Sequence, residues 1–252
     1  MDDAHRLLRE GRFEAAEERA RAAVAKREGA RGRDRRPMAV RQARYYAIWA
    51  AALHGRGASV LPELEDLIAD LEPPTDASPL LLRARLTRAW VLIDEARPAE
   101  AQSEAEAVLR VLTRTMYVTD VWELELCALV CLGDALCALD RHEEAETIAR
   151  GHLPRAPEHF AFGLHLSLLH SLSGQGRHQE ALDECDVHHP DSSPADFGAH
   201  EFATAVALHG LGRHDEAKEQ ARRALTACER HLHPDHPRVG EIGALLARMA
   251  AA

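Results

Sequence analysis

The sequence predicts an all-α solenoid of about six helical hairpins, followed by a C-terminal capping helix. Three observations lead to this fold class. A short phrase recurs six times along the 252 residues, at spacings of 36 to 44 residues. Stretches with apolar residues at the helical period flank the copies. No alternating run of β-branched residues indicates a sheet. Self-similarity at such a period is the signature of stacked repeats.

The phrase reads Gly-Arg-Phe-Glu-Ala-Ala at 11–16, Asp-Arg-His-Glu-Glu-Ala at 140–145, and Gly-Arg-His-Gln-Glu-Ala and Gly-Arg-His-Asp-Glu-Ala at 176–181 and 212–217. Degenerate copies lie at 96–101 and 55–60, and the latter keeps neither the alanine nor the acidic residues. A glycine or aspartate readily ends a helix in the left-handed conformation. Acidic residues suit the positive end of the next helix. The small alanine lets two helices cross closely. Each phrase therefore predicts the turn of a hairpin.

The elements follow from these turns. First helices are expected at about 2–10, 37–54, 78–95, 119–139, 157–174 and 194–210. Second helices are expected at about 13–28, 59–71, 98–113, 142–152, 178–187 and 214–231. A final helix at 237–250 would cap the stack, because a terminal repeat needs a finished outer face. The chain is thus one domain, 1–252, with repeats at about 1–31, 37–73, 78–115, 119–154, 157–190 and 194–231.

One repeat carries a recognisable pattern of a Leu-Gly pair, a large apolar residue, two alanines and a proline: Leu132, Gly133, Leu136, Ala145, Ala149 and Pro157. Along nearly its whole length the chain resembles bacterial tetratricopeptide repeat (TPR) proteins. The segment from Cys228 to Pro237 and the long spacings are similar to kinesin-light-chain-like repeats. The resemblance implies a right-handed α–α superhelix whose first helices line a concave groove.

The resemblance also implies which positions of each first helix face that groove. The candidate ligand-binding residues are Gln42, Tyr45, Trp49, Arg83, Leu86, Trp90, Val130, Asp134, His170 and Phe202. Two of the three tryptophans fall in the same register of adjacent repeats, in a chain with only 4% aromatic residues. One interpretation is an aromatic strip for an extended or helical peptide. The alternative is that Trp49 and Trp90 fill gaps between long neighbouring helices.

The favoured function is a non-enzymatic scaffold or adaptor that binds a protein or peptide. The alternatives are a regulatory or sensory protein acting with a separate DNA-binding or signalling partner, and a structural protein that self-assembles through helix 237–250. No nucleophile–base pair, paired carboxylates or phosphate loop indicates an enzyme, and no cofactor is expected. The carboxylate clamp of chaperone-binding TPR domains is excluded, because the chain has no asparagine and no lysine in any expected first helix.

A metal site is not expected either. Cys127 and Cys131 share a helix face, but Cys137 points elsewhere, so with His170 nearby these thiols are read as buried apolar groups. The cluster His231, His233 and His236 lies in a proline-rich connector, as in the family that the chain resembles. The histidines of the turn phrase (His142, His178 and His214) are expected to be solvated.

The net charge and the cysteine content limit which classes of partner and which cellular location are expected. The net charge of −10, from 31 basic and 41 acidic residues, argues against general nucleic-acid binding. The basic run 26–36 is expected to be a solvated loop, with a contact to nucleic acid or an acidic partner as the alternative. Five cysteines without disulfide spacing, and a first segment without an apolar signal core, predict a cytoplasmic location. No membrane partner is expected, and a homo-oligomer is possible.

Overall fold

The computed structural model describes residues 2–28, 37–72, 78–114, 121–187 and 197–251. Within these ranges all regular structure is helical and no strand occurs. The main helices are α1 (Asp2–Arg9), α2 (Phe13–Glu28), α3 (Pro37–Ala51), α4 (Gly57–Leu71), α5 (Pro79–Asp94), α6 (Pro98–Arg114), α7 (Val121–Ala138), α8 (His142–His152), α9 (Glu158–Gly174), α10 (His178–Val187), α11 (Ala199–Gly210), α12 (His214–His231) and α13 (Pro237–Ala251).

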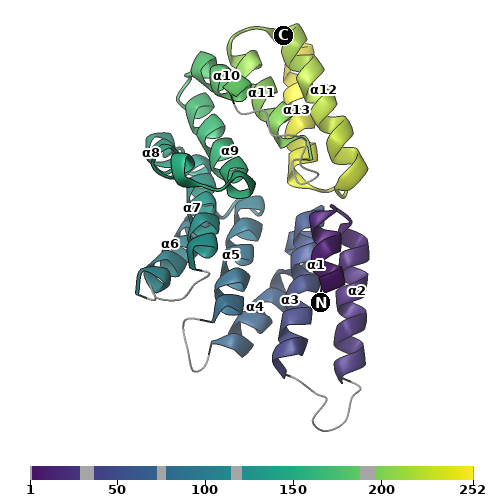
Figure 1. Cartoon of the computed structure of the whole chain (residues 1–252). Helices are drawn as coiled ribbons and strands as arrows, with labels where there is room; N and C mark the ends of the chain where they lie inside the picture. The colour runs from purple at the N-terminus through teal and green to yellow at the C-terminus, as the bar shows by residue number, and fades with distance from the viewer. Residues whose placement is uncertain (1, 29–36, 73–77, 115–120, 188–196, 252) are drawn as a thin grey trace.

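Each helix packs against its neighbours in sequence, which confirms the predicted all-α solenoid. Helices α3, α5, α7, α9 and α11 also pack against one another in that order, so the first helices of the hairpins form one continuous row. In Figure 1 the stack curves from the purple N-terminal helices through the blue α5 and the teal α7 to the yellow α13. The expected helix ends agree closely with the observed ones, and α2, α8, α10 and α12 begin and end at the expected residues.

The turns have the backbone conformation that the repeated phrase predicts. The first residue of every copy is left-handed, with φ of 70° at Gly11, 99° at Gly55, 56° at Ala96, 58° at Asp140, 73° at Gly176 and 74° at Gly212. In the turn after α7, the N–H of Arg141 donates to the carbonyl of Leu136 at 2.9 Å. This bond satisfies a carbonyl that the helix end leaves without a partner.

The position that ends each phrase lies where two helices cross. Five alanines there are at most 1% exposed, namely Ala16, Ala101, Ala145, Ala181 and Ala217. The second repeat lacks this alanine and forms a different turn. Residues Ala52–Arg56 make one wide helical turn, with the left-handed Gly55 inside it, before α4 begins. The departure of this copy from the phrase therefore changes the local structure without removing the hairpin.

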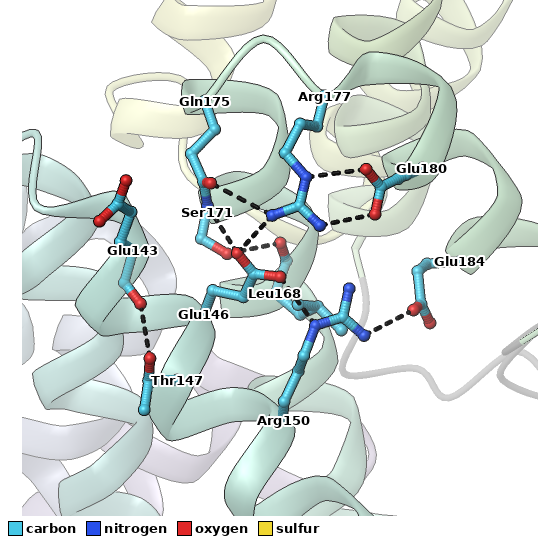
Figure 2. Close-up of polar contacts among 10 residues, drawn as sticks. All are labelled: Glu143, Glu146, Thr147, Arg150, Leu168, Ser171, Gln175, Arg177, Glu180 and Glu184. Carbon is cyan, nitrogen blue, oxygen red and sulfur yellow. Dashed lines mark hydrogen bonds and ion pairs between the residues drawn. The ribbon is translucent and has the colours of Figure 1, made fainter.

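Polar contacts join successive hairpins, as Figure 2 shows around Glu146 of α8. This carboxylate accepts hydrogen bonds from Arg150 at 2.8 Å, Gln175 at 2.8 Å and Arg177 at 2.6 Å. Arg150 also donates to Glu184 of α10 at 3.2 Å. Burial raises the pKa of Glu146, but the three donors outweigh it and lower that pKa to about 2. The network fixes α8 to the turn before α10.

The turn histidines His142, His178 and His214 are half-buried, so they are less solvated than the sequence predicts. His142 is only 18% exposed at its side chain. A Cβ atom added at Gly174 would lie 2.3 Å from the His142 ring, and one at Gly210 would lie 2.3 Å from the His178 ring. Each of these rings therefore fills the space beside a glycine that ends the first helix of the next hairpin. The phrase encodes the packing between repeats as well as the turn.

The two ends of the solenoid meet. The rings of Phe13 and Phe197 pack edge to face with centroids 5.3 Å apart, and those of His54 and His233 do so at 5.5 Å. The N–H of His233 donates to the carbonyl of His54 at 2.9 Å. Leu232 shares one buried core with residues of α1 and α2. In Figure 1 the ends of α12 and α13 accordingly face the upper ends of α1–α3. The solenoid closes into a ring.

Helix α13 caps the last hairpin, as the sequence predicts. Its apolar residues Ile242, Leu245 and Met249 are at most 2% exposed and belong to the core formed with α11 and α12. The first turn of α13 faces the inside of the ring, where Arg238 lines a central cavity. The capping helix thus also contributes to the inner surface.

Candidate functional site: two cavities on the inner wall

A central cavity of about 580 Å³ lies inside the ring. Helices α1, α2, α3, α5, α7 and α9 contribute to its wall, together with the connector before α13 and the start of that helix. Four of the predicted residues line it: Trp49, Trp90, Val130 and Asp134. Its volume falls in the range of pockets that bind small ligands or a few side chains. The predicted groove therefore includes a real concavity.

The central cavity is apolar at the level of the two tryptophans. Trp49 of α3, Trp90 of α5 and Val130 of α7 come from successive helices of the inner row. Across from Val130, α9 presents Gly163, where an added Cβ would lie 3.1 Å from the valine side chain. The buried indole Nε1 of Trp49 has no hydrogen-bond partner among the described residues. An unsatisfied buried donor is uncommon in native structures.

One helical turn further on, the wall becomes charged. Asp94 and Asp134 lie four residues after Trp90 and Val130, on the same faces of α5 and α7. Asp134 accepts a hydrogen bond from the Ser167 hydroxyl at 2.6 Å. The surrounding wall displaces part of the hydration of both carboxylates, and this desolvation raises the pKa of each to about 6.

Other charged groups act on these carboxylates. The guanidinium of Arg238 lowers the pKa of both Asp94 and Asp134, whereas Glu241 raises that of Asp94. His236 also lines the cavity, and burial lowers its pKa to about 4, so it is neutral at physiological pH. At neutral pH the two carboxylates are ionised, and Arg238 is the guanidinium that acts on both of them, while Arg9 also lines the cavity.

A side cavity of about 540 Å³ lies toward the other end of the inner helices. It contains the predicted residues Gln42, Tyr45 and Arg83. Arg83 approaches Glu123 of α7 at 3.7 Å, and Met38, which is 53% exposed, lies at the rim. This cavity is more polar than the apolar level of the central one.

A hydrogen bond separates the two cavities. The hydroxyls of Tyr45 and Thr87 are 3.3 Å apart, and Tyr45 lines the side cavity whereas Thr87 lines the central one. Thr87 donates to the carbonyl of Arg83 at 3.0 Å, so the tyrosine hydroxyl is the donor to Thr87. Burial raises the pKa of Tyr45, which keeps this hydroxyl protonated.

The remaining predicted residues lie elsewhere. Leu86 is 2% exposed and belongs to the core between α5, α6 and α7. His170 is exposed and Phe202 packs against the core that the two chain ends share, and neither lines the central or the side cavity. The two interpretations of Trp49 and Trp90 are compatible, because each indole both packs against a core cluster and lines the central cavity.

The sequence did not predict the cavity residues that line the wall only because the two ends of the solenoid meet. Phe13, Phe197, His236 and Arg238 come from opposite ends of the chain, and no periodicity within a repeat relates them. Asp94 lies one helical turn after the predicted residue Trp90 on the same face of α5, and extending the predicted face by one turn would have included it. The connector Pro-Asp-His-Pro at 234–237 was the one available signal, since it departs from the turn phrase.

The cysteines behave as apolar groups. The Cys131 thiol is buried and donates to the carbonyl of Leu86 at 3.7 Å, and that of Cys137 donates to the Ser167 carbonyl at 3.8 Å. Burial raises the pKa of Cys127 to about 11 and that of Cys137 to about 12. Within the described ranges, no three His, Cys, Asp or Glu side chains are placed to hold a metal ion. Residues 29–36 of the basic run lie outside the described residues.

None of the helices in the described part of the chain combines the length and apolar character that crossing a bilayer requires. No protein-family model matches the chain, and no curated protein matches its sequence.

Proposed function

We propose that this chain is a non-enzymatic, TPR-type scaffold that binds a peptide segment of a partner protein in its central cavity. The observation that carries the proposal is the pairing of Trp49 and Trp90, half-buried side chains on adjacent inner helices that line one cavity of about 580 Å³. Aromatic side chains in a partly enclosed pocket are the residues that most often anchor a bound partner.

The TPR assignment is supported by the details of the hairpins. The left-handed residue that opens each turn and the buried alanines at the helix crossings fall where the repeated phrase puts them. Stacked hairpins of this kind present an inner surface built from first helices, which suits recognition of an extended or helical segment. None of the five cysteines forms a disulfide, which is compatible with a reducing compartment such as the cytoplasm.

Self-assembly through the terminal helix receives less support. The apolar residues of α13 are already covered by α11 and α12 of the same chain, so that face is not available for a second copy. The described surface has two large exposed apolar side chains, Met38 and Trp122, which lie on different helices. A binding role for the inner wall therefore accounts for more of the structure.

Selection from a displayed library of random dodecapeptides tests the proposal. The purified full chain should enrich peptides that compete with one another, and the Trp49→Ala/Trp90→Ala variant should not. Met38→Ala is the control, because Met38 is 53% exposed and lines the side cavity, not the central one. Circular dichroism and urea unfolding establish that each variant is folded. Equal enrichment by the wild-type chain and the folded double variant would overturn the proposal.

A further inference from the structure

The wall of the central cavity changes from apolar to charged along its length, and this change indicates which side chains a bound segment would carry. Its middle is formed by Trp49, Trp90 and Val130, and its end by the carboxylates Asp94 and Asp134. A bound segment that lies along the inner helices therefore passes from apolar contacts to anionic ones within about one helical turn, or ~5 Å. That is close to the length of the aliphatic stem of a basic side chain.

The charged end is anionic overall. Asp94, Asp134 and the neighbouring Glu241 act on this region, and Arg238 is the guanidinium that lowers the pKa of both aspartates. Arg9 also lines the cavity but is not among the groups that shift the pKa of Asp134. His236 carries no charge at neutral pH, since burial lowers its pKa to about 4. Asp134 receives one hydrogen bond, from a neutral hydroxyl. Asp134 is half-buried and Asp94 is exposed to the cavity, and one guanidinium does not balance these carboxylates, so an added cation would be attracted there.

We propose that the segment bound in the central cavity carries a lysine or arginine side chain next to apolar residues, with its cationic group at Asp94 and Asp134. This inference rests on the peptide-binding function proposed above. The aliphatic stem of the basic residue lies against Trp49 and Trp90, whose ring faces also attract a cation. The ammonium or guanidinium then reaches the carboxylates as a charge-assisted hydrogen-bond donor.

The aromatic middle of the cavity gives the remaining contacts. Apolar residues on either side of the basic one fill the space beside Val130 and Phe160. Acidic segments are disfavoured, because their carboxylates would approach Asp94 and Asp134 with like charge. The side cavity does not share this preference, since its Arg83 is paired with Glu123.

The same peptide selection, read by residue content, tests this inference. Peptides enriched by the wild-type chain should contain lysine or arginine flanked by apolar residues. The Asp94→Asn/Asp134→Asn variant should still enrich apolar peptides but lose the excess of basic residues. Asp66→Asn/Asp215→Asn is the matched control, because both aspartates are exposed and line neither cavity. It should select the same peptides as the wild-type chain.

A double-mutant cycle then locates the contact. A selected peptide and its copy with the basic residue changed to glutamine are titrated into both chains by fluorescence anisotropy. The change should weaken binding to the wild-type chain by about tenfold or more, and binding to the Asp94→Asn/Asp134→Asn variant by less than about twofold. Equal weakening in both chains, or wild-type selections without a basic excess, would overturn the inference and leave peptide binding intact. A selection that enriches no peptide would instead contradict the proposed function itself.

Discussion

The rings of Phe13 and Phe197 meet edge to face at 5.3 Å, although one opens the second helix of the first hairpin and the other lies just before α11 of the sixth. Through this contact the α1–α2 hairpin rests on the far end of the stack. Phe13 is 4% exposed, and Phe197 also contacts His231 at a centroid distance of 5.3 Å. The two phenylalanines therefore form the main aromatic contact between the two ends of the solenoid.

Removing this contact should open the ring. Phe13→Ala should lower the free energy of unfolding by about 3–5 kcal/mol, because it truncates a buried phenylalanine. In the variant that remains folded, small-angle X-ray scattering should give a larger radius of gyration. Leu168→Ala is the control, since Leu168 is 1% exposed in the core of α9 and α10 and lies away from the junction. It should destabilise the chain without enlarging it. An unchanged radius in Phe13→Ala would contradict closure through this pair.

The left-handed turns allow a paired test of backbone conformation. Ala96 has φ of 56°, which is strained for a residue with a Cβ atom. Gly176 has φ of 73°, and no atom lies within 4 Å of the position that a methyl group would take there. Ala96→Gly should raise the free energy of unfolding by about 1 kcal/mol, and Gly176→Ala should lower it by about 1 kcal/mol. Urea unfolding measures both. Changes of the same sign would show that side-chain contacts, and not φ, dominate these turns.

The pairing of His142 with Gly174 predicts a rescue. Gly174→Ala should be destabilising, because its methyl group would lie 2.3 Å from the imidazole ring. The double variant Gly174→Ala/His142→Ala should recover part of that loss, since the smaller side chain makes room. Thermal unfolding of the two single variants and the double variant gives the coupling. Additive effects would mean that the ring moves aside at no cost.

Glu146 should govern stability in acid. Its pKa is lowered to about 2 in the folded chain, so its contribution is present above the unfolded value of 4.5 and is lost as the pH falls from there toward 2. Glu146→Gln should reduce the free energy of unfolding by about 2 kcal/mol at pH 7 and by much less at pH 2. Glu143→Gln on the same helix is the control, because that side chain is exposed. A loss of unfolding free energy that is the same at both pH values would show that Glu146 acts through packing and not through its charge.

The carboxylates of the central cavity should affect the pH dependence of stability in the opposite direction to Glu146. The pKa of Asp94 is raised from 3.8 to about 6, so the folded chain binds more protons than the unfolded chain between these values. Its stability should therefore fall as the pH rises through that window. Asp94→Asn should make the free energy of unfolding larger at pH 7 and reduce this slope, leaving the part that comes from Asp134. Urea unfolding at pH 4 and pH 7 measures both, and a destabilised Asp94→Asn at pH 7 would contradict the prediction. Retaining an aspartate that costs stability accords with a binding role for it.

Local chemistry explains what the sequence predicts well. Helix ends and turns depend on a few adjacent residues, so Gly11, Asp140 and Gly212 could be assigned their conformation from the phrase alone. The tryptophans could be placed on the inner wall by register. The register fails by one residue in α5, where Thr87 lines the central cavity and Leu86 enters the core, because each residue advances about 100° around the helix.

Ring closure could not be predicted in this way. It depends on the sum of small rotations between successive hairpins, and a modest change in each would leave the ends far apart. The contacts of Phe197 and His233 with the N-terminal hairpins are consequences of that sum. For the same reason the roles of His236 and Arg238 in the cavity were out of reach of any pattern within one repeat.

A solenoid with free ends can gain or lose a hairpin, because each unit contacts only its neighbours. The meeting of His54 with His233 makes the two ends of the chain neighbours too, so every hairpin here has two adjoining units to satisfy. Deleting or duplicating one hairpin would displace His54 from His233 by the full rotation and rise of a repeat unit. The number of hairpins in this chain is therefore a geometric quantity, fixed by the circumference of the ring.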